Sequence, residues 1–302
     1  MPHTARPRRG PTRRRRVLLL ACASVALGAV LSVAVVPSES VVYATDVFGS
    51  LRAPGDPAFI AGHRGDRSVA PENTLPSLEA ALANPALGFI ETDVQLTKDG
   101  VPVLFHDTTL KRITGHRGAI ADYDWAQLRT FDAGSWYAEE YAGVHIPTFA
   151  SLLDRLAKTE KRALVELKYA WTPDEVSRLV SLIEERGLGS RVVLASFSFE
   201  TLESIQAVAP RTQRLMLVRE ITDDPVPVAR MFGVLAVATT AKAIAAHPDA
   251  VQRMHAANLG LLCYTLNTEE TWDQARSLGV DGIITDVPSE LDAWLAMTSR
   301  GT

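Results

Sequence analysis

Short apolar runs alternate with amphipathic stretches along most of this chain, from residue 59 to about residue 285. Such alternation is typical of β/α units that build a parallel sheet. The apolar runs predict strands at 59–61, 89–94, 101–105, 163–167, 192–197, 214–218, 234–238, 261–265 and 282–285. The stretches between them predict helices at 74–83, 149–157, 173–186, 199–208, 242–257 and 269–277.

One strand too many is present for an eight-stranded barrel, and the turn at Asp99-Gly100 explains it. An Asp-Gly pair between alternating apolar residues is a strong hairpin signal. We therefore interpret residues 94–106 as a hairpin that extends the second strand. The other runs then predict a TIM-type (β/α)₈ barrel, with an insertion at about 107–147 whose aromatic residues we expect mainly to pack on one another.

The N-terminal segment differs from the rest of the chain. Seven arginines lie within residues 6–16, and residues 17–36 contain no charge. A cleavable signal usually has an apolar region of about 7–15 residues, whereas a membrane span needs about 20. Residues 1–44 therefore predict either a signal peptide, with a small-residue cleavage pattern at Val42-Tyr43-Ala44, or a retained N-terminal membrane anchor. Residues 45–57 read as a linker and 58–302 as the barrel domain.

Charge indicates location and excludes one class of partner. The arginines before the apolar stretch orient the body outward, so we expect an extracytoplasmic protein, secreted or anchored to the membrane by residues 17–36. The formal charge of −4 becomes −11 when the seven N-terminal arginines are set aside. So acidic a body argues against nucleic-acid binding, which usually leaves a basic footprint.

Polar motifs follow several predicted strands. In a strand, residues two apart face the same side, so Glu91 and Asp93 point together, as do Glu166 and Lys168. Two ionised acids beside each other on a buried strand need a partner cation. Mg²⁺ or Ca²⁺ suits their oxygen ligands, and zinc fits less well because no close His/Cys cluster accompanies them.

Two histidines, His63 and His106, also end predicted strands. A single histidine is most often structural, but these two would flank the same acid pair, and Asp107 could orient one imidazole. Arg64 could bind a phosphate bidentately and Lys168 could act as a point charge, or both could serve as counter-ions for the neighbouring carboxylates. Active-site groups of barrel enzymes lie at the C-terminal strand ends, where all these residues fall.

At these residues the chain resembles the glycerophosphodiester phosphodiesterase family, over about residues 58–290. The resemblance rests on motifs in a fixed order: His63-Arg64-Gly65, Pro71-Glu72-Asn73-Thr74, Glu91-Thr92-Asp93-Val94, Thr97-Lys98-Asp99-Gly100, Val103-Leu104-Phe105-His106-Asp107, Glu166-Leu167-Lys168, Ser196-Phe197 and Gly282-Ile283-Ile284-Thr285-Asp286-Val287-Pro288. One departure is Tyr264, where the family often has tryptophan, and residues 219–245 match poorly.

The resemblance implies a TIM-type barrel and a set of roles. It places metal ligands on Glu91, Asp93 and Glu166, the catalytic base on His63 and the catalytic acid on His106. Arg64 and Lys168 fall on positions that contact phosphate and substrate.

The expected reaction is metal-dependent hydrolysis of a glycerophosphodiester to sn-glycerol 3-phosphate and an alcohol, with one Mg²⁺ or Ca²⁺ ion. The nucleophile is either water or a glycerol hydroxyl. Three alternatives stay open: phospholipase D-like activity on lysophospholipids or sphingomyelin, degradation of cell-wall glycerophosphate polymers, and a non-catalytic surface-binding barrel. The expected partner is a small-molecule diester or lysolipid, with possible membrane association through the N-terminal segment.

Overall fold

The computed structural model describes residues 42–298 of the chain. Most of the predicted signal peptide or anchor, including residues 17–36, lies outside the described residues. Among the residues that are described, no helix has the length and apolar character needed to cross a membrane.

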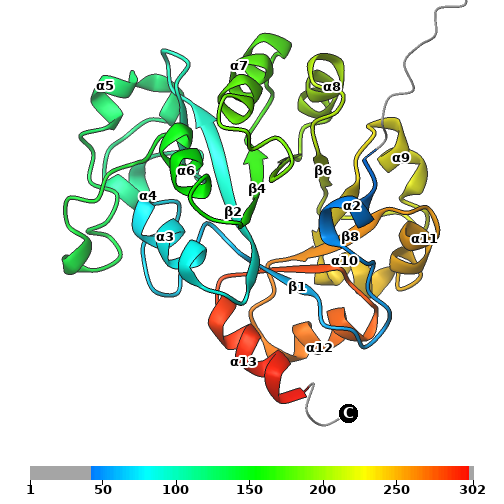
Figure 1. The fold of residues 1–302 in the computed structure, drawn as a ribbon. Helices are drawn as coiled ribbons and strands as arrows, with labels where there is room; N and C mark the ends of the chain where they lie inside the picture. Colours follow the sequence, from blue (N-terminus) through cyan, green and yellow to red (C-terminus); the bar gives the residue numbers. More distant parts are fainter. Residues whose placement is uncertain (1–41, 299–302) are drawn as a thin grey trace, which may run out of the picture. The chain divides into compact units, whose positions relative to one another are not determined.

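Eight parallel strands close into a barrel, which confirms the predicted TIM-type fold (Figure 1). Closure comes from the first strand, which pairs with the second on one side and with the last on the other. The barrel strands are β1 (Phe59–Gly62), β2 (Leu87–Leu96), β4 (Arg162–Leu167), β5 (Val192–Ser196), β6 (Arg214–Leu217), β7 (Ala236–Thr240), β8 (Gly260–Tyr264) and β9 (Gly282–Thr285). β7 begins two residues later than predicted, because the Val234 N–H still bonds Ala229 O in the preceding turn.

A ninth strand, β3 (Pro102–Leu104), pairs antiparallel with the end of β2 and lies outside the closed barrel. Val94 pairs with Leu104, and Leu96 pairs with Pro102. The turn between the two strands contains Gly100 with φ of +81°, a left-handed backbone that glycine adopts at low cost. This hairpin returns the chain to the C-terminal end of β2.

Helices surround the strands (Figure 1). They are α3 (Leu75–Ala83), α6 (Phe149–Leu156), α7 (Pro173–Glu184), α8 (Phe199–Val208), α9 (Val226–Met231), α10 (Ala241–Ala246), α11 (Ala250–Ala256), α12 (Glu269–Ser277) and α13 (Pro288–Thr298). The predicted helix at 242–257 is therefore two helices. Pro248 lies at the break, where proline cannot donate the backbone hydrogen bond of a continuous helix.

The segment between β3 and α6 contains α4 (Lys111–Thr114), η1 (Ile120–Asp122), α5 (Trp125–Leu128) and η2 (Glu139–Tyr141). These elements share a small apolar core of their own around Leu110, Ile120 and Leu128, all fully buried. The segment also contacts the loop after β1, because the hydroxyl of Tyr137 donates to Ser68 O and that of Tyr141 to Val69 O. It is thereby fixed beside the C-terminal ends of the first strands.

Part of the predicted linker is folded. Residues Ala44–Phe48 form the short helix α2, and the Phe48 ring lies 5.0 Å from that of Phe59 and 5.9 Å from that of Phe89. Phe59 begins β1 and Phe89 lies early in β2, so α2 covers the N-terminal end of the barrel interior. Gly260 leaves room for the ring, because a Cβ there would lie 2.8 Å from a Phe48 ring carbon.

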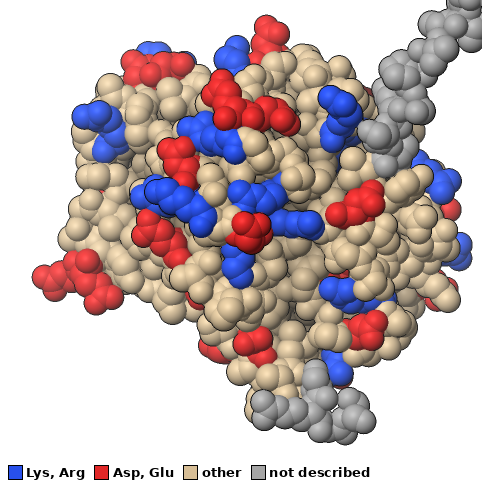
Figure 2. All heavy atoms as spheres, in the orientation of Figure 1, with Lys and Arg blue, Asp and Glu red and all other residues tan. Residues whose placement is uncertain are grey.

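Charged side chains of both signs are mixed on the face seen in Figure 2. A group of lysine and arginine side chains lies near the middle of this face, with acidic side chains among them. No extended surface of one sign covers the part of the described chain that this view presents.

Candidate active site

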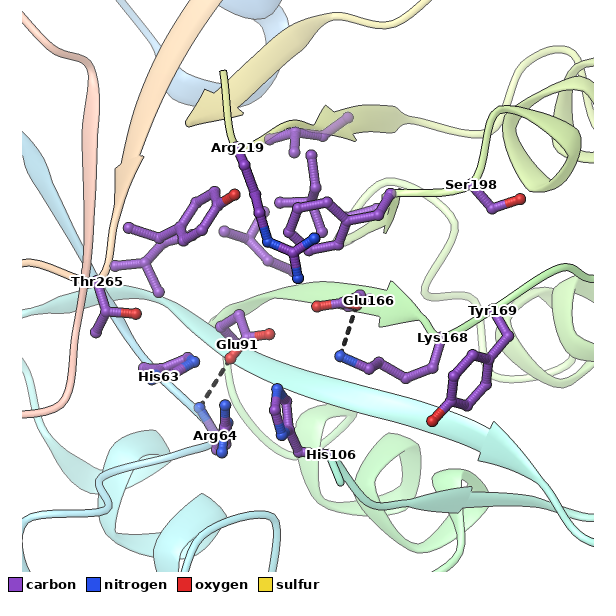
Figure 3. A pocket seen from close by; sticks show the side chains of 17 residues that line it. His63, Arg64, Glu91, His106, Glu166, Lys168, Tyr169, Ser198, Arg219 and Thr265 are labelled. Atoms are coloured by element: carbon purple, nitrogen blue, oxygen red, sulfur yellow. Dashed lines mark hydrogen bonds and ion pairs between the residues drawn. The ribbon is translucent and has the colours of Figure 1, made fainter. Parts of the chain in front are cut away.

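The predicted site residues gather at the C-terminal ends of β1, β2 and β4 (Figure 3). Six of them line one pocket of about 510 Å³: His63, Arg64, Glu91, His106, Glu166 and Lys168. The seventh, Asp93, is only 1% exposed and does not line the pocket, but its Oδ1 lies 3.4 Å from Nζ of Lys168, which does. Groups that are more than 100 residues apart in sequence therefore meet in one cavity.

Three carboxylates form the centre of this site. Ligand oxygens of Glu91, Asp93 and Glu166 all lie within 4.8 Å of one another, and all three residues are buried. Strand register explains the approach, because Asp93 on β2 is paired with Glu166 on β4. Glu91 faces the same side as Asp93, as expected for residues two apart.

Crowding of these acids perturbs their ionisation. Burial and the charge of Asp93 raise the pKa of Glu166 to about 7 and raise the pKa of Glu91 well above its usual value. Burial opposes ionisation of Asp93 as well, but Arg64 and Lys168 hold its pKa below the usual value. A buried oxygen cluster that cannot carry three negative charges alone fits a hard divalent cation, which would favour ionisation of all three.

A second group of possible ligands, Glu72, His106 and Asp107, fits a cation less well. Glu72 already bonds Arg64, Arg67 and Arg112 at 2.6–2.8 Å, and Arg112 also bonds Asp107 at 2.7 Å. Three guanidinium groups thus neutralise these carboxylates. We therefore assign the possible metal centre to the first cluster.

Arg64 is held in an unusual backbone conformation with φ of +59°. Its N–H donates to Glu91 Oε2 at 2.9 Å, and its carbonyl accepts from the Asn73 N–H and from Ser77 Oγ. A non-glycine residue in the left-handed region costs about 1–3 kcal/mol and persists only when its surroundings hold it there. These bonds aim the side chain at Glu72 and Asp93.

Each predicted catalytic histidine is bonded through Nδ1 to a carboxylate. His63 Nδ1 lies 2.6 Å from Asp286 Oδ1, and His106 Nδ1 lies 2.9 Å from Asp107 Oδ1. This arrangement leaves Nε2 of both rings for other partners. Burial lowers the pKa of both histidines below 6.5, an effect that is partly offset by Asp286 at His63, and by Asp93 and then Asp107 at His106.

Sequence reasoning gave Asp286, Glu72 and Asn73 no role in the active site, although each lies within a motif of the family resemblance. Asp286 orients His63, and Asn267 Nδ2 donates to it at 2.8 Å. Asn73 Nδ2 donates to Asp93 Oδ2 at 2.8 Å, and Glu72 bonds the arginines described above. The signal was present in the motifs, but the partners lie up to 223 residues away.

Comparison with known proteins decides the family. A sequence model of the glycerophosphoryl diester phosphodiesterase family matches residues 63–290. This chain belongs to that family. The match begins at His63 and includes every residue of the site described above, so the predicted family and enzyme class, a phosphoric diester hydrolase, are confirmed.

Individual family members match more than three quarters of this chain and share its fold. A glycerophosphodiester phosphodiesterase of Caldanaerobacter subterraneus subsp. tengcongensis is 30% identical over 242 residues, covering 77% of this chain and 96% of the relative. A solved phosphodiesterase of Oleispira antarctica, in complex with the product sn-glycerol-3-phosphate, superposes with a TM-score of 0.74 at 27% identity, covering 79% and 96% of the two chains. A glycerophosphodiester phosphodiesterase of Agrobacterium tumefaciens gives a TM-score of 0.69 at 27% identity, covering 78% and 99%.

No residues were assigned to the other wall of the pocket from the sequence. It is formed by residues on or after the later strands, among them Phe197, Arg219 and Tyr264. The Tyr264 hydroxyl donates to Val218 O at 2.8 Å, so its oxygen is tied to the end of β6. The ring at this position, where the family often has tryptophan, lies edge-on to Phe197 at 5.9 Å.

Proposed function

We propose that this protein hydrolyses glycerophosphodiesters to sn-glycerol 3-phosphate and an alcohol, with a divalent cation bound by Glu91, Asp93 and Glu166. Family membership supports the reaction, as does the product bound to the Oleispira antarctica relative. The observation that carries the proposal is the meeting of three carboxylates from β2 and β4 with His63 and His106 around one pocket.

The carboxylate cluster would supply the metal site. A cation held there would polarise the phosphoryl oxygens and stabilise the charge that develops on them. Both Mg²⁺ and Ca²⁺ accept three carboxylates together with further oxygen ligands, so the donor set alone does not select between them.

His63 acts as the base and His106 as the acid in this proposal. Burial keeps the pKa of His63 below 6.5, so its imidazole is neutral at pH 7 and able to accept a proton. Asp286 holds Nδ1, which leaves Nε2 to take the proton from the nucleophile, either water or a glycerol hydroxyl. His106, held by Asp107, would protonate the leaving alkoxide.

Arg64 and Lys168 would bind the reacting phosphate. Arg64 Nε is buried and lacks a hydrogen-bond partner among the described residues, although Asp93 Oδ2 lies 3.4 Å away. A buried donor without an acceptor is costly, so a phosphate oxygen would satisfy it. Lys168 now pairs with Glu166 at 2.9 Å and stands at the edge of the same pocket.

The test is a coupled assay for glycerol 3-phosphate release from glycerophosphocholine and other soluble diesters. The variants His63→Gln and His106→Gln should each lower kcat by about 10²–10⁴, the usual loss when general acid or base catalysis is removed. A micellar lysolipid assayed in parallel would reveal a phospholipase D-like preference instead.

His247→Gln is the matched control for these variants. His247 also pairs with a carboxylate, at 2.8 Å from Asp223, but it does not line the pocket. It should therefore retain full activity. Wild-type turnover by the His63 or His106 variant would refute the assigned roles.

We also propose that the protein is extracytoplasmic, secreted or anchored by residues 17–36, with an N-terminal segment that is either cut or retained. The arginine-rich start and the uncharged stretch support this location. Cell fractionation with mass spectrometry of the mature N-terminus would test it, and recovery of the full chain in the cytoplasm would exclude it.

A further inference from the structure

Arg219 stands on the wall of the pocket that faces the carboxylates, two residues after β6 ends. Its guanidinium Cζ lies 5.3 Å from the centre of the Phe197 ring, a cation–π contact. Figure 3 shows the side chain of Arg219 extending into the pocket, toward the side where Glu91 and Glu166 lie. Arg219 itself is exposed, so its charge is available at the pocket surface.

The described part of the chain gives Arg219 no carboxylate partner within ion-pair distance, unlike the other pocket cations. Arg64 pairs with Glu72 at 2.6 Å, and Lys168 pairs with Glu166 at 2.9 Å. Arg219 contacts an aromatic ring instead. An arginine that projects into a substrate pocket without a counter-ion is suited to bind an anion, because its planar fork matches a carboxylate or a phosphate.

The same contact acts against a cationic head group. An aromatic face in a pocket ordinarily attracts a quaternary ammonium such as choline. Here one face of Phe197 is covered by the Arg219 guanidinium, and the Tyr264 ring lies perpendicular to Phe197 at 5.9 Å between ring centres. A positive head group would therefore meet a like charge at this wall.

We infer that Arg219 selects diesters whose leaving alcohol carries an anionic group, a carboxylate or a second phosphate. The inference rests on the proposed function, in which the reacting phosphate is bound on the opposite wall by Arg64 and Lys168. An extended diester would then place its phosphate beside Arg64 and Lys168 and its head group beside Arg219.

Two pairs of substrates test this selection. Glycerophosphoserine differs from glycerophosphoethanolamine by one carboxylate, and glycerophosphoglycerol can be compared with its terminally phosphorylated form. The wild-type chain should cleave the more anionic member of at least one pair with a kcat/KM about tenfold higher, a difference typical of one charge-assisted hydrogen bond. The pair that responds identifies the anion as carboxylate or phosphate.

The variant Arg219→Gln should lose that preference, and it should cleave glycerophosphoethanolamine at least as fast as the wild-type chain does, because the ammonium no longer meets a like charge. Arg219→Lys should retain part of the preference, because the charge remains but the planar fork is lost. Arg211→Gln is the matched control. Arg211 is exposed and precedes β6, at the opposite end of the strand from Arg219, so this variant makes the same change in net charge but makes it away from the pocket.

Three outcomes would overturn the inference. Equal cleavage of both members in each pair by the wild-type chain would exclude selection by charge. An equal loss of activity on all substrates in Arg219→Gln would assign Arg219 to the reacting phosphate instead. If the wild-type chain cleaved none of the substrates, the proposed function itself would fail, and this inference with it.

Discussion

At the scale of single residues, the site depends on backbone positions that few side chains could occupy. Gly65 follows Arg64 with φ of +84°, and a Cβ there would lie 2.6 Å from the backbone carbon of Ser77. The Gly65 N–H donates to Glu91 O at 3.0 Å. The turn after β1 therefore packs directly on α3 and on the strand that carries two of the carboxylates.

We predict that Gly65→Ala destabilises the protein by roughly 2–4 kcal/mol, from backbone strain and from the clash with Ser77. Urea unfolding of the variant and the wild-type chain would measure the difference. Gly100→Ala is the control, because Gly100 has a φ of +81° but open space around it. It should cost only about 1 kcal/mol. Equal losses in the two variants would show that the clash contributes nothing.

The contact between His63 and Asp286 leads us to predict how kcat/KM depends on pH. Burial lowers the pKa of His63, while Asp286 raises it in partial compensation. As pH falls through that pKa, His63 takes up a proton and can no longer act as a base, so kcat/KM should fall on the acidic side of pH 6.5. Asp286→Asn removes the compensating charge and should move this acidic limb to lower pH, with a lower plateau. A limb that stays in place would exclude Asp286 as the positioning residue.

The lowered pKa of His63 also makes the free energy of unfolding depend on pH. Because the folded-state pKa of His63 lies below the unfolded value of about 6.5, the unfolded chain binds more protons below that pH. This contribution to stability is therefore present above about pH 6.5 and is lost as pH falls. Asp286, whose pKa is lowered to about 2, acts in the same direction at lower pH, between about 4 and 2.

Single site residues could be predicted from sequence where reactive side chains also followed the two-residue period of a strand. Glu91 and Asp93 are two apart in a strand, so their common direction could be read directly. Asp286 could not be assigned, because its partner His63 is 223 residues away and only closure of the barrel brings β1 beside β9. Arg219 lies where the family resemblance is weak, so only the folded pocket reveals it.

At the scale of elements, α2 is a short helix that the pattern of apolar and polar residues does not predict. Residues 45–57 contain two glycines, two prolines and little periodicity, which favours a linker. The helix has only five residues, and its apolar side chains face the barrel rather than forming a long stripe. Its burial comes from tertiary packing on Phe59 and Phe89, which no local signal encodes.

We predict that Phe48→Ala lowers the free energy of unfolding by roughly 3–5 kcal/mol, as for other large aromatic residues removed from a core. Phe48 is 7% exposed and contacts two other rings. Tyr43→Ala, in the same segment but 45% exposed, is the control and should stay within about 0.5 kcal/mol of the wild type. Thermal unfolding that is unchanged in Phe48→Ala would contradict the packing of α2.

At the scale of the whole molecule, the fold was predictable because nearly every strand of the barrel is buried and apolar. The turn at Asp99-Gly100 separated the hairpin strand β3 from the eight strands that close. The internal structure of residues 107–147 was harder to predict, because short helices held together by a small core leave no regular period of apolar residues in the sequence. Barrel closure then determines which strand ends meet, and with them the site.

In the proposed mechanism, Glu91, Asp93 and Glu166 together bind one divalent cation that hydrolysis requires. Its most direct test is glycerol 3-phosphate release after treatment with EDTA, followed by titration with Mg²⁺ or Ca²⁺, for the wild-type chain and for Glu166→Gln. We predict that EDTA abolishes the wild-type activity and that one of the two ions restores it. Glu166→Gln should require at least about tenfold more of that ion for the same activity, which corresponds to a loss of roughly 1.4 kcal/mol of binding free energy. Full activity after removal of the metal would contradict the claim.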